Sequence, residues 1–278
     1  MTVKIVTDST SDIPPSLAEE LGITVVPLNV HFGTDVFKDG IDIKPDEFYG
    51  KLVSSSRLPT TSQPSVGDFL SIYDELGKEH KEIVSIHISG KLSGTLNSAT
   101  QAKEQYSGDA RIEAIDSKHG SIGLAMVALA AHKAASDGLG LDEVIKEIQS
   151  AINEVEFFAL VDTLEYLEKG GRIGKAQAFM GSMLKIKPIL TVRDGEVFPL
   201  EKIRSRNKGI DRICELVKLC LPVSGMCVAY TTTPDDAKDL SDRLQELIPN
   251  EKIILSQVGP VVGTHSGPGV LAVALRKG

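Results

Sequence analysis

Apolar runs of strand length alternate with helical patterns through the first half of the chain. The strand candidates cover residues 3–7, 23–30, 83–88 and 112–115. The helix candidates cover residues 16–21, 45–53, 66–76, 96–105 and 122–131. Alternation of this kind is typical of a mostly parallel sheet, because each parallel strand needs a long crossover before the next one begins. We therefore expect the first half to form a Rossmann-like α/β domain.

The pattern changes after a helix candidate at residues 141–155. Asp194 and Gly195 separate two apolar runs, and an Asp-Gly pair suits the tight turn between antiparallel strands. The strand candidates here cover residues 157–161, 188–192, 197–203, 227–231, 252–257 and 270–275, and the helix candidates cover residues 206–219 and 235–247. We predict an N-terminal domain at residues 1–157 and a C-terminal α/β domain with antiparallel strands at residues 158–278.

Composition narrows the class of protein. The 278 residues suffice for two ordinary domains, and the net charge of −8 argues against nucleic acid as a partner. The three cysteines, Cys214, Cys220 and Cys227, lack the close spacing of a zinc site, and we expect them to be reduced, as in a cytoplasmic protein. The N-terminus does not resemble a targeting segment, and the most apolar run, residues 122–131, is shorter than the ~20 residues of a membrane helix. We expect a buried helix there, no metal or cofactor, and at most transient membrane contact.

A segment near the C-terminus places one histidine among glycines and prolines. Residues 259–269 contain four glycines and two prolines around His265, with Thr264 directly before it. Glycine reaches positive φ freely and proline fixes φ, so we expect a shaped loop that holds a polar ligand group. The alternative is a tight turn with a surface histidine.

Two further polar segments lie in the first half. Ser65 and Asp68 form a predicted helix cap, which leaves Thr61 and Ser62 on the preceding loop. Their hydroxyls are free to meet a ligand or to satisfy only the local backbone. Residues 89–95 join a strand candidate to a helix candidate, where free backbone amides suit an anion, and Ser93 is the side-chain candidate there.

Aspartates also occur beside the predicted strand ends. Ligands bind at the carboxyl ends of parallel strands, so Asp8, Ser93 and Asp116 are expected to line one edge of the sheet. Asp12 precedes Pro14 at a predicted helix start, and we favour helix capping over ligand binding for this side chain.

Taken together and in order, these segments resemble the DegV family of bacterial fatty-acid-binding proteins over essentially the whole chain. The matching segments are residues 8–13, Thr61-Ser62-Gln63-Pro64-Ser65, Leu92-Ser93-Gly94-Thr95, Gly170-Gly171-Arg172, Lys187-Pro188-Ile189, Lys202-Ile203-Arg204 and the histidine segment. The chain departs from the family pattern at Leu96, where an aromatic residue is usual, and at Ser266, where threonine is common.

The resemblance implies a two-domain DegV-like fold that binds one long-chain fatty acid in a tunnel between its domains. It places the carboxylate on Thr61, Ser93 and His265. The supporting loops would contain Ser62, Gly94, Thr95 and Thr264. It further implies a carrier without catalysis of its own, which presents the carboxylate to a separate fatty acid kinase for acyl phosphate formation in phospholipid metabolism.

Two basic segments stand out in this acidic chain, around Arg172 and around Arg204. Taken alone, each is typical of solvated surface charge, although each could also contact an acidic partner or a phosphate. With the resemblance, Arg172 and Arg204 become candidates for docking the kinase on a surface outside the tunnel.

An enzyme is the competing interpretation. Haloacid-dehalogenase-like phosphatases place their second aspartate two residues after the first, and Thr10 stands there after Asp8. Ser93 and His265 could pair as in a serine hydrolase, but the segment around Ser93 lacks the G-x-S-x-G pattern. The chain also lacks a G-x-x-x-x-G-K-[ST] nucleotide loop. A stand-alone hydrolase or phosphatase acting on a lipid or small acid remains the alternative.

Overall fold

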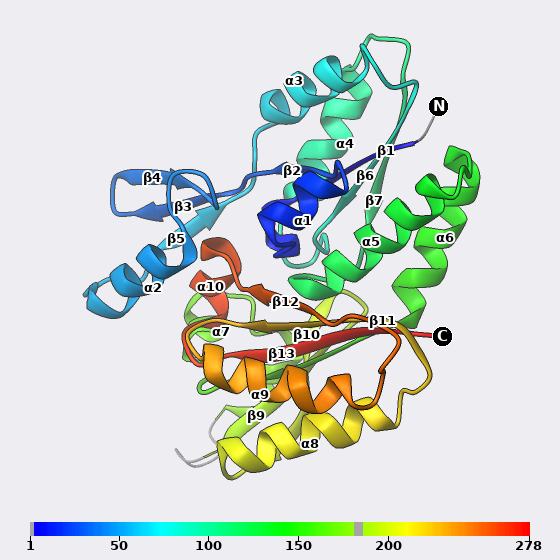
Figure 1. The fold of residues 1–278 in the computed structure, drawn as a ribbon. Coiled ribbons are helices and arrows are strands. Elements are labelled where there is room, and N and C mark those ends of the chain that lie inside the picture. The colour runs from blue at the N-terminus through cyan, green and yellow to red at the C-terminus, as the bar shows by residue number, and fades with distance from the viewer. Residues whose placement is uncertain (1–2, 181–185) are drawn as a thin grey trace.

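Helix α5, at Ile122–Ser136, lies between the two largest sheets of the protein (Figure 1). The computed structural model describes residues 3–180 and 186–278. Alanine and glycine occupy much of α5, and apolar side chains cover nearly its whole surface. Small side chains let a helix approach a sheet closely on each side without leaving voids. The buried helix expected from the apolar run at residues 122–131 is confirmed.

The first sheet is parallel throughout. Its order is β2-β1-β6-β7, with bounds β1 Lys4–Asp8, β2 Thr24–Val26, β6 Glu82–His87 and β7 Arg111–Asp116. One face packs against α3 (Val66–Leu76) and α4 (Thr95–Gln105). The other face packs against α1 (Pro15–Glu20), α5 and α6 (Leu141–Glu154). The predicted mostly parallel sheet is confirmed.

The second sheet has six strands and is mainly antiparallel. Its order is β10-β9-β8-β13-β11-β12, with bounds β8 Val155–Leu160, β9 Lys187–Arg193, β10 Glu196–Ile203, β11 Val223–Tyr230, β12 Ile254–Gln257 and β13 Leu271–Lys277. Among the described strand pairs of this sheet, only β11 and β12 are parallel to each other. Helices α8 (Arg206–Lys218) and α9 (Pro234–Gln245) cover its outer face, while α5 packs on its inner face.

The turn between β9 and β10 forms as the sequence predicts. Asp194 has φ of 50° and Gly195 has φ of 81°. Positive φ at both central residues matches the twist of a two-residue hairpin, which explains the Asp-Gly pair. After β8, the short helix α7 (Glu165–Lys169) and the 3-10 helix η2 (Gly174–Phe179) lead toward this hairpin.

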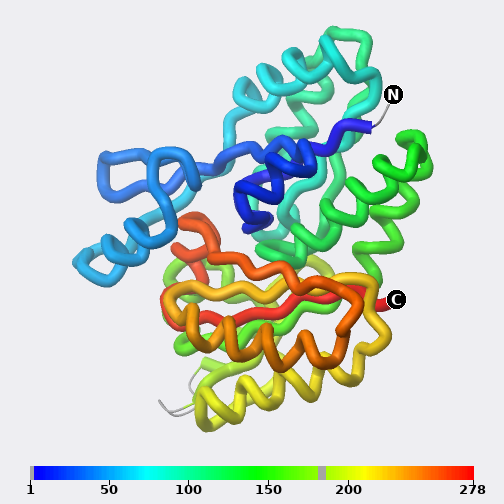
Figure 2. The backbone as a smooth tube through the Cα atoms, in the orientation of Figure 1, coloured from blue at the N-terminus to red at the C-terminus, as the bar shows by residue number. Residues whose placement is uncertain are grey.

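A third, smaller sheet differs from the sequence-based expectation. Residues 23–30 do not form one strand: the chain leaves the parallel sheet after β2, passes Pro27, and enters a second sheet as β3 (Asn29–Phe32). There β3 pairs with β4 (Asp35–Lys38) and β5 (Thr60–Ser62), both antiparallel, and α2 (Pro45–Ser54) packs against them. We call residues 29–62 the arm, because they project from the body of the protein (Figure 2).

The glycine-rich segment also differs from the expected loop. Residues Pro260–Ser266 of this segment form helix α10. Near the other end of the chain, the short 3-10 helix η1 covers Ser9–Ser11. Proline is well tolerated in the first turn of a helix, so Pro260 begins α10 rather than preventing it. The irregular backbone follows the helix, where Gly267 and Gly269 have φ of 74° and 79°.

The parts of the chain fit together around α10. Figure 1 shows this helix beside the arm and at one end of the six-stranded sheet. The predicted division between residues 157 and 158 stays a prediction. Among residues 3–180 and 186–278, no helix is both long and apolar enough to cross a membrane.

The cap of α3 provides a test of the local folding signals. The Ser65 hydroxyl accepts a hydrogen bond from the Asp68 amide at 3.1 Å, and the Asp68 carboxylate accepts one from the Ser65 amide at 2.8 Å. We expect Ser65→Ala to lower the free energy of unfolding by ~1 kcal/mol in urea denaturation. Ser71→Ala, on the exposed face of the same helix, is the control and should change it by less than ~0.5 kcal/mol. Equal effects in the two variants would contradict the cap's role.

Candidate functional site

A cavity lies where the arm, the parallel sheet and the six-stranded sheet meet. Its lining includes Thr10 after β1, Thr61 on β5, Ala159 on β8 and Val261 on α10. The cavity volume is about 150 Å³. This is more than one bound water or a small anion needs.

Most of the cavity wall is aliphatic. Its apolar side chains include Ile88, Leu92, Val161, Leu190, Val262 and Val270. On the inner face of the six-stranded sheet, Ala159 of β8 lies opposite Ala272 of β13, and Phe157 precedes this pair. Two small side chains at paired positions leave a groove in the sheet surface, which suits a narrow apolar chain.

The three side chains expected to bind a carboxylate all line this cavity. Thr61 comes from β5, Ser93 from the loop between β6 and α4, and His265 from α10. Thr61 Oγ1 lies 2.8 Å from His265 Nε2, and Ser93 Oγ lies 2.8 Å from Thr95 Oγ1. The structure thus brings together residues that are 204 positions apart in the sequence.

The four expected supporting residues have different surroundings. Ser62 lines the cavity, and its Oγ lies 2.9 Å from His31 Nε2, a contact that the sequence did not indicate. Thr95 is buried and its amide donates to Ser93 Oγ at 3.3 Å, directly after Gly94 caps α4. Thr264 instead donates to the Pro260 carbonyl at 2.9 Å, so its hydroxyl stabilises α10 internally.

His265 is an uncharged hydrogen-bonding group. Burial, together with the positive charge of Arg172, lowers the pKa of His265 to about 4. Its Nδ1 is buried and has no hydrogen-bond partner among the described residues. Burying an N–H group without an acceptor costs more free energy than burying a ring nitrogen that has no hydrogen. We therefore assign the proton of the His265 ring to Nε2. Nε2 then donates to Thr61, whose own hydroxyl hydrogen can point to a ligand.

Gly170 sets the position of the His265 ring. A Cβ atom at Gly170 would lie 2.2 Å from His265 Nδ1, closer than non-bonded atoms approach. The ring therefore occupies its site only because position 170 has no side chain. Gly171 differs, since it has φ of 70° and no atom within 4 Å of its would-be Cβ.

Arg172 connects this glycine to the loop of Ser93. Its Nε donates to the Leu92 carbonyl at 3.1 Å and its Nη1 donates to the Gly170 carbonyl at 2.8 Å. Arg172 lines the cavity, so the expectation that it lies outside the tunnel is wrong. Arg204, by contrast, is exposed.

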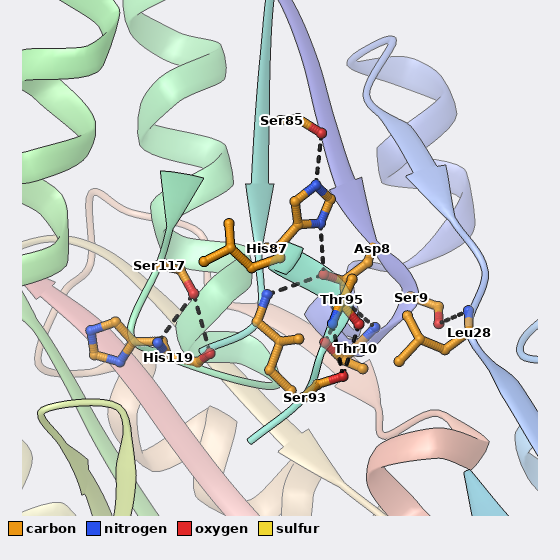
Figure 3. Close-up of polar contacts among 12 residues, drawn as sticks. Asp8, Ser9, Thr10, Leu28, Ser85, His87, Ser93, Thr95, Ser117 and His119 are labelled. Atoms are coloured by element: carbon orange, nitrogen blue, oxygen red, sulfur yellow. Dashed lines mark hydrogen bonds and ion pairs between the residues drawn. The ribbon is translucent and has the colours of Figure 1, made fainter. Parts of the chain in front are cut away.

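A buried polar network lies behind the Ser93 loop (Figure 3). Asp8 accepts hydrogen bonds from the Thr10 amide at 3.0 Å, from the Ile88 amide at 3.1 Å and from the Thr10 hydroxyl. His87 Nδ1 lies 3.0 Å from Asp8 Oδ2, and His87 Nε2 lies 2.7 Å from Ser85 Oγ. Asp8 thereby fixes Thr10, which reaches the cavity, rather than reaching it itself.

A hydrogen-bonded chain runs from Ser85 through His87 to Asp8, in the order of a Ser-His-Asp triad, but these residues are closed off from solvent. All three residues are 0% exposed, so no substrate reaches Ser85. The expected alternative pair is not formed either, since the Ser93 hydroxyl bonds Thr95. Among the residues that the structure describes, no group of three or more His, Cys, Asp or Glu side chains could hold a metal ion.

The aspartates near the strand ends have structural partners. Asp116 accepts from the Gly90 amide at 3.3 Å and from the Lys118 amide at 2.8 Å, and it is not part of the cavity lining. The capping role expected for Asp12 is wrong, because α1 begins at Pro15 without a side-chain cap. Asp12 Oδ1 instead accepts from the Gly259 amide at 2.8 Å, a partner 247 positions away.

Comparisons with known proteins agree on one family. The family model for "Uncharacterised protein, DegV family" matches residues 2–278. A DegV domain-containing protein of Clostridium perfringens is 39% identical over 284 residues, covering 100% of this chain and 99% of that protein. The solved structure of DegV, a fatty acid binding protein from Bacillus subtilis, is 34% identical with a TM-score of 0.91, covering 100% of both chains. A stearic acid-binding protein from Eubacterium ventriosum is 27% identical with a TM-score of 0.91, covering 99% of this chain and 98% of that one.

The contact between Gly170 and His265 can be tested by titration. We expect Gly170→Ala to displace the imidazole from its buried position, so that the pKa of His265 rises from about 4 toward its ordinary value near ~6.5. NMR of the histidine ring measures this pKa directly. Gly171→Ala is the control, since its positive φ costs ~1 kcal/mol of stability but leaves the pKa of His265 low. An unchanged pKa in Gly170→Ala would contradict the assigned contact.

Proposed function

The chain belongs to the DegV family, and we propose that it binds one long-chain fatty acid in the cavity and presents its carboxylate to a fatty acid kinase. The carboxylate lies against Thr61, Ser93 and His265, and the acyl chain lies along the aliphatic wall. The chain itself acts as a cytoplasmic carrier, with the ligand held between a domain at residues 1–157 and one at residues 158–278. The kinase supplies the phosphoryl group and forms the acyl phosphate.

The observation that carries this proposal is one cavity that combines a few polar side chains with a mostly aliphatic wall. Thr61 and His265 are in contact and Ser93 lines the same cavity, whereas most of the other lining residues are apolar. Burying an acyl chain contributes ~0.8 kcal/mol for each methylene group, or ~12 kcal/mol gross for a palmitate-sized tail. The cost of association lowers this figure considerably. The apolar wall can therefore provide the affinity.

The polar residues then orient the carboxylate. Thr61 and Ser93 supply hydroxyl hydrogens, and the neutral ring of His265 supports the Thr61 hydroxyl through the 2.8 Å contact. Two nitrogens of Arg172 are already bonded to backbone carbonyls, so its guanidinium adds positive charge without enclosing the carboxylate in a two-pronged ion pair. A carboxylate held in this way keeps an oxygen accessible for phosphorylation.

Alanine variants test the carboxylate site. Ser93→Ala and Thr61→Ala each remove one hydroxyl donor, and each should weaken fatty-acid binding by ~1–3 kcal/mol. Fluorescence titration with a long-chain fatty acid measures the affinity, and native mass spectrometry of the purified protein measures the bound lipid. Ser71→Ala, far from the cavity lining, should bind as the wild type does. Undiminished binding in both site variants would contradict the assignment, and ester or phosphate-ester hydrolysis without a kinase would favour the enzyme interpretation.

Presentation to the kinase calls for a separate test. Arg204 is exposed on a chain of net charge −8, so an acidic partner surface would attract it. We expect Arg204→Ala to keep bound fatty acid but to lower kinase-dependent acyl phosphate formation, with a smaller dependence on salt than the wild type shows. Arg57→Ala, an exposed arginine on the arm, is the matched control. Loss of bound lipid, or unchanged transfer, would remove Arg204 from the kinase surface.

A further inference from the structure

Two buried carboxyl groups meet at the start of α10, the helix that carries His265. Asp12 follows η1 and is 6% exposed, whereas Asp39 follows β4 at the base of the arm and is 4% exposed. A Cβ at Gly259 would lie 3.2 Å from Asp12 Oδ1 and 3.2 Å from Asp39 Oδ1. The two oxygens are therefore no farther apart than twice that distance. They belong to segments that the sequence separates from α10 by more than half the chain.

Both carboxyl groups hold the first turn of α10. Asp12 Oδ1 accepts from the Gly259 amide at 2.8 Å, and its Oδ2 accepts from the Ser121 hydroxyl at 2.5 Å. Asp39 is hydrogen-bonded to the Ser9 hydroxyl and to the Val261 amide. Because α10 brings Val261, Val262 and His265 into the cavity wall, a shift of its first turn would move the polar end of the site.

The surroundings of the pair are acidic. Asp8 on β1 is the other carboxylate that acts on both groups, and Tyr49 on α2 faces both of them. The hydrogen-bond partners of the two carboxyl groups are hydroxyls and backbone amides, with no cation among the contacts described for them. Asp39 Oδ2 is buried and has no hydrogen-bond partner within residues 3–180 and 186–278, and an ionised carboxylate in that position would carry a large desolvation cost.

A bound proton relieves this cost. Burial raises the pKa of Asp12 well above its ordinary value and raises the pKa of Asp39 to about 7, with further contributions from the neighbouring carboxylates. Asp39 therefore keeps a proton up to about neutral pH. The folded state binds this proton more tightly than the unfolded chain does. The resulting stabilisation is therefore complete below pH ~4 and is lost as the pH rises to about 7.

We propose that Asp12 and Asp39 are positioning residues, and that loss of the proton held by Asp39 above neutral pH loosens α10 and weakens fatty-acid binding through His265. The inference rests on the proposed function, because it uses fatty-acid binding as its readout. His265 itself does not explain a change near neutral pH, since its pKa of about 4 leaves the ring uncharged throughout that range.

The test measures binding of cis-parinaric acid, a fluorescent long-chain fatty acid, from pH 5.5 to 8.5 at constant ionic strength. We expect the wild type to lose about tenfold in affinity, which corresponds to one unit of pKa difference between the bound and free protein, with a midpoint near pH 7. Asp39→Asn should flatten this profile, because the amide does not titrate. Asp35→Asn, an exposed carboxylate on β4, is the control and should keep the wild-type profile.

A second variant makes the test independent of how well Asp39→Asn folds. Ser9→Ala removes a hydrogen bond that favours the ionised form of Asp39, so the midpoint should move to higher pH. Titration of the probe's own carboxyl group is common to all variants and would remain in Asp39→Asn. If Asp39→Asn and Ser9→Ala both keep the wild-type profile, this inference is wrong, whereas the proposed function is unaffected. Absence of fatty-acid binding by the wild type at every pH would overturn the proposed function and this inference with it.

Discussion

Close packing of α5 between two sheets determines where this protein can form a cavity. The helix is apolar on nearly every side, and its small side chains contact β1 and β6 on one side and β8, β11 and β13 on the other. A helix of this kind leaves no space along its length, because interiors pack to the density of organic crystals. The cavity lies beside its N-terminal end, where Gly120 and Ser121 are part of the lining.

Buried aspartates near that end illustrate two ways of placing a carboxylate in a protein interior. Asp8 is surrounded by donors, including the Thr10 and Ile88 amides and the His87 ring, so its lone pairs are well satisfied. Asp39 retains an unpartnered oxygen beside other acidic groups. Hydrogen bonds reach both oxygens of Asp8, whereas those made to Asp39 leave its Oδ2 without a partner among the described residues. The same residue type therefore meets the cost of burial with a complete set of donors at position 8 and with an incomplete set at position 39.

Local signals predicted most of the helices and strands, and they failed where a distant contact decides the structure. Helix α3 begins and ends at the predicted residues because its capping box and apolar periodicity agree. Glycines in residues 259–269 indicated a loop, yet a Cβ at Gly263 would lie 2.5 Å from the Tyr49 hydroxyl. This glycine permits close approach to α2 rather than an irregular backbone. Likewise, the residues next to Asp12 in the sequence do not indicate that its partner is the Gly259 amide. The residues next to Thr61 do not indicate its contact with His265. The order of known motifs indicated that Thr61, Ser93 and His265 belong to one site, whereas their contacts required the folded chain.

The arm has a consequence for how a bound ligand would be handled. It contributes Thr61 and Ser62 to the polar end of the cavity, while β8, β9 and β13 of the six-stranded sheet contribute Phe157, Leu190 and Ala272 to the apolar wall. Pro27 breaks the strand path into the arm, and the chain leaves it at Gln63 and Pro64. The polar and apolar parts of the lining thus come from different parts of the fold. Under the proposed function, a substitution in the arm would change the contacts of the ligand's head group and leave the wall around its tail unaltered.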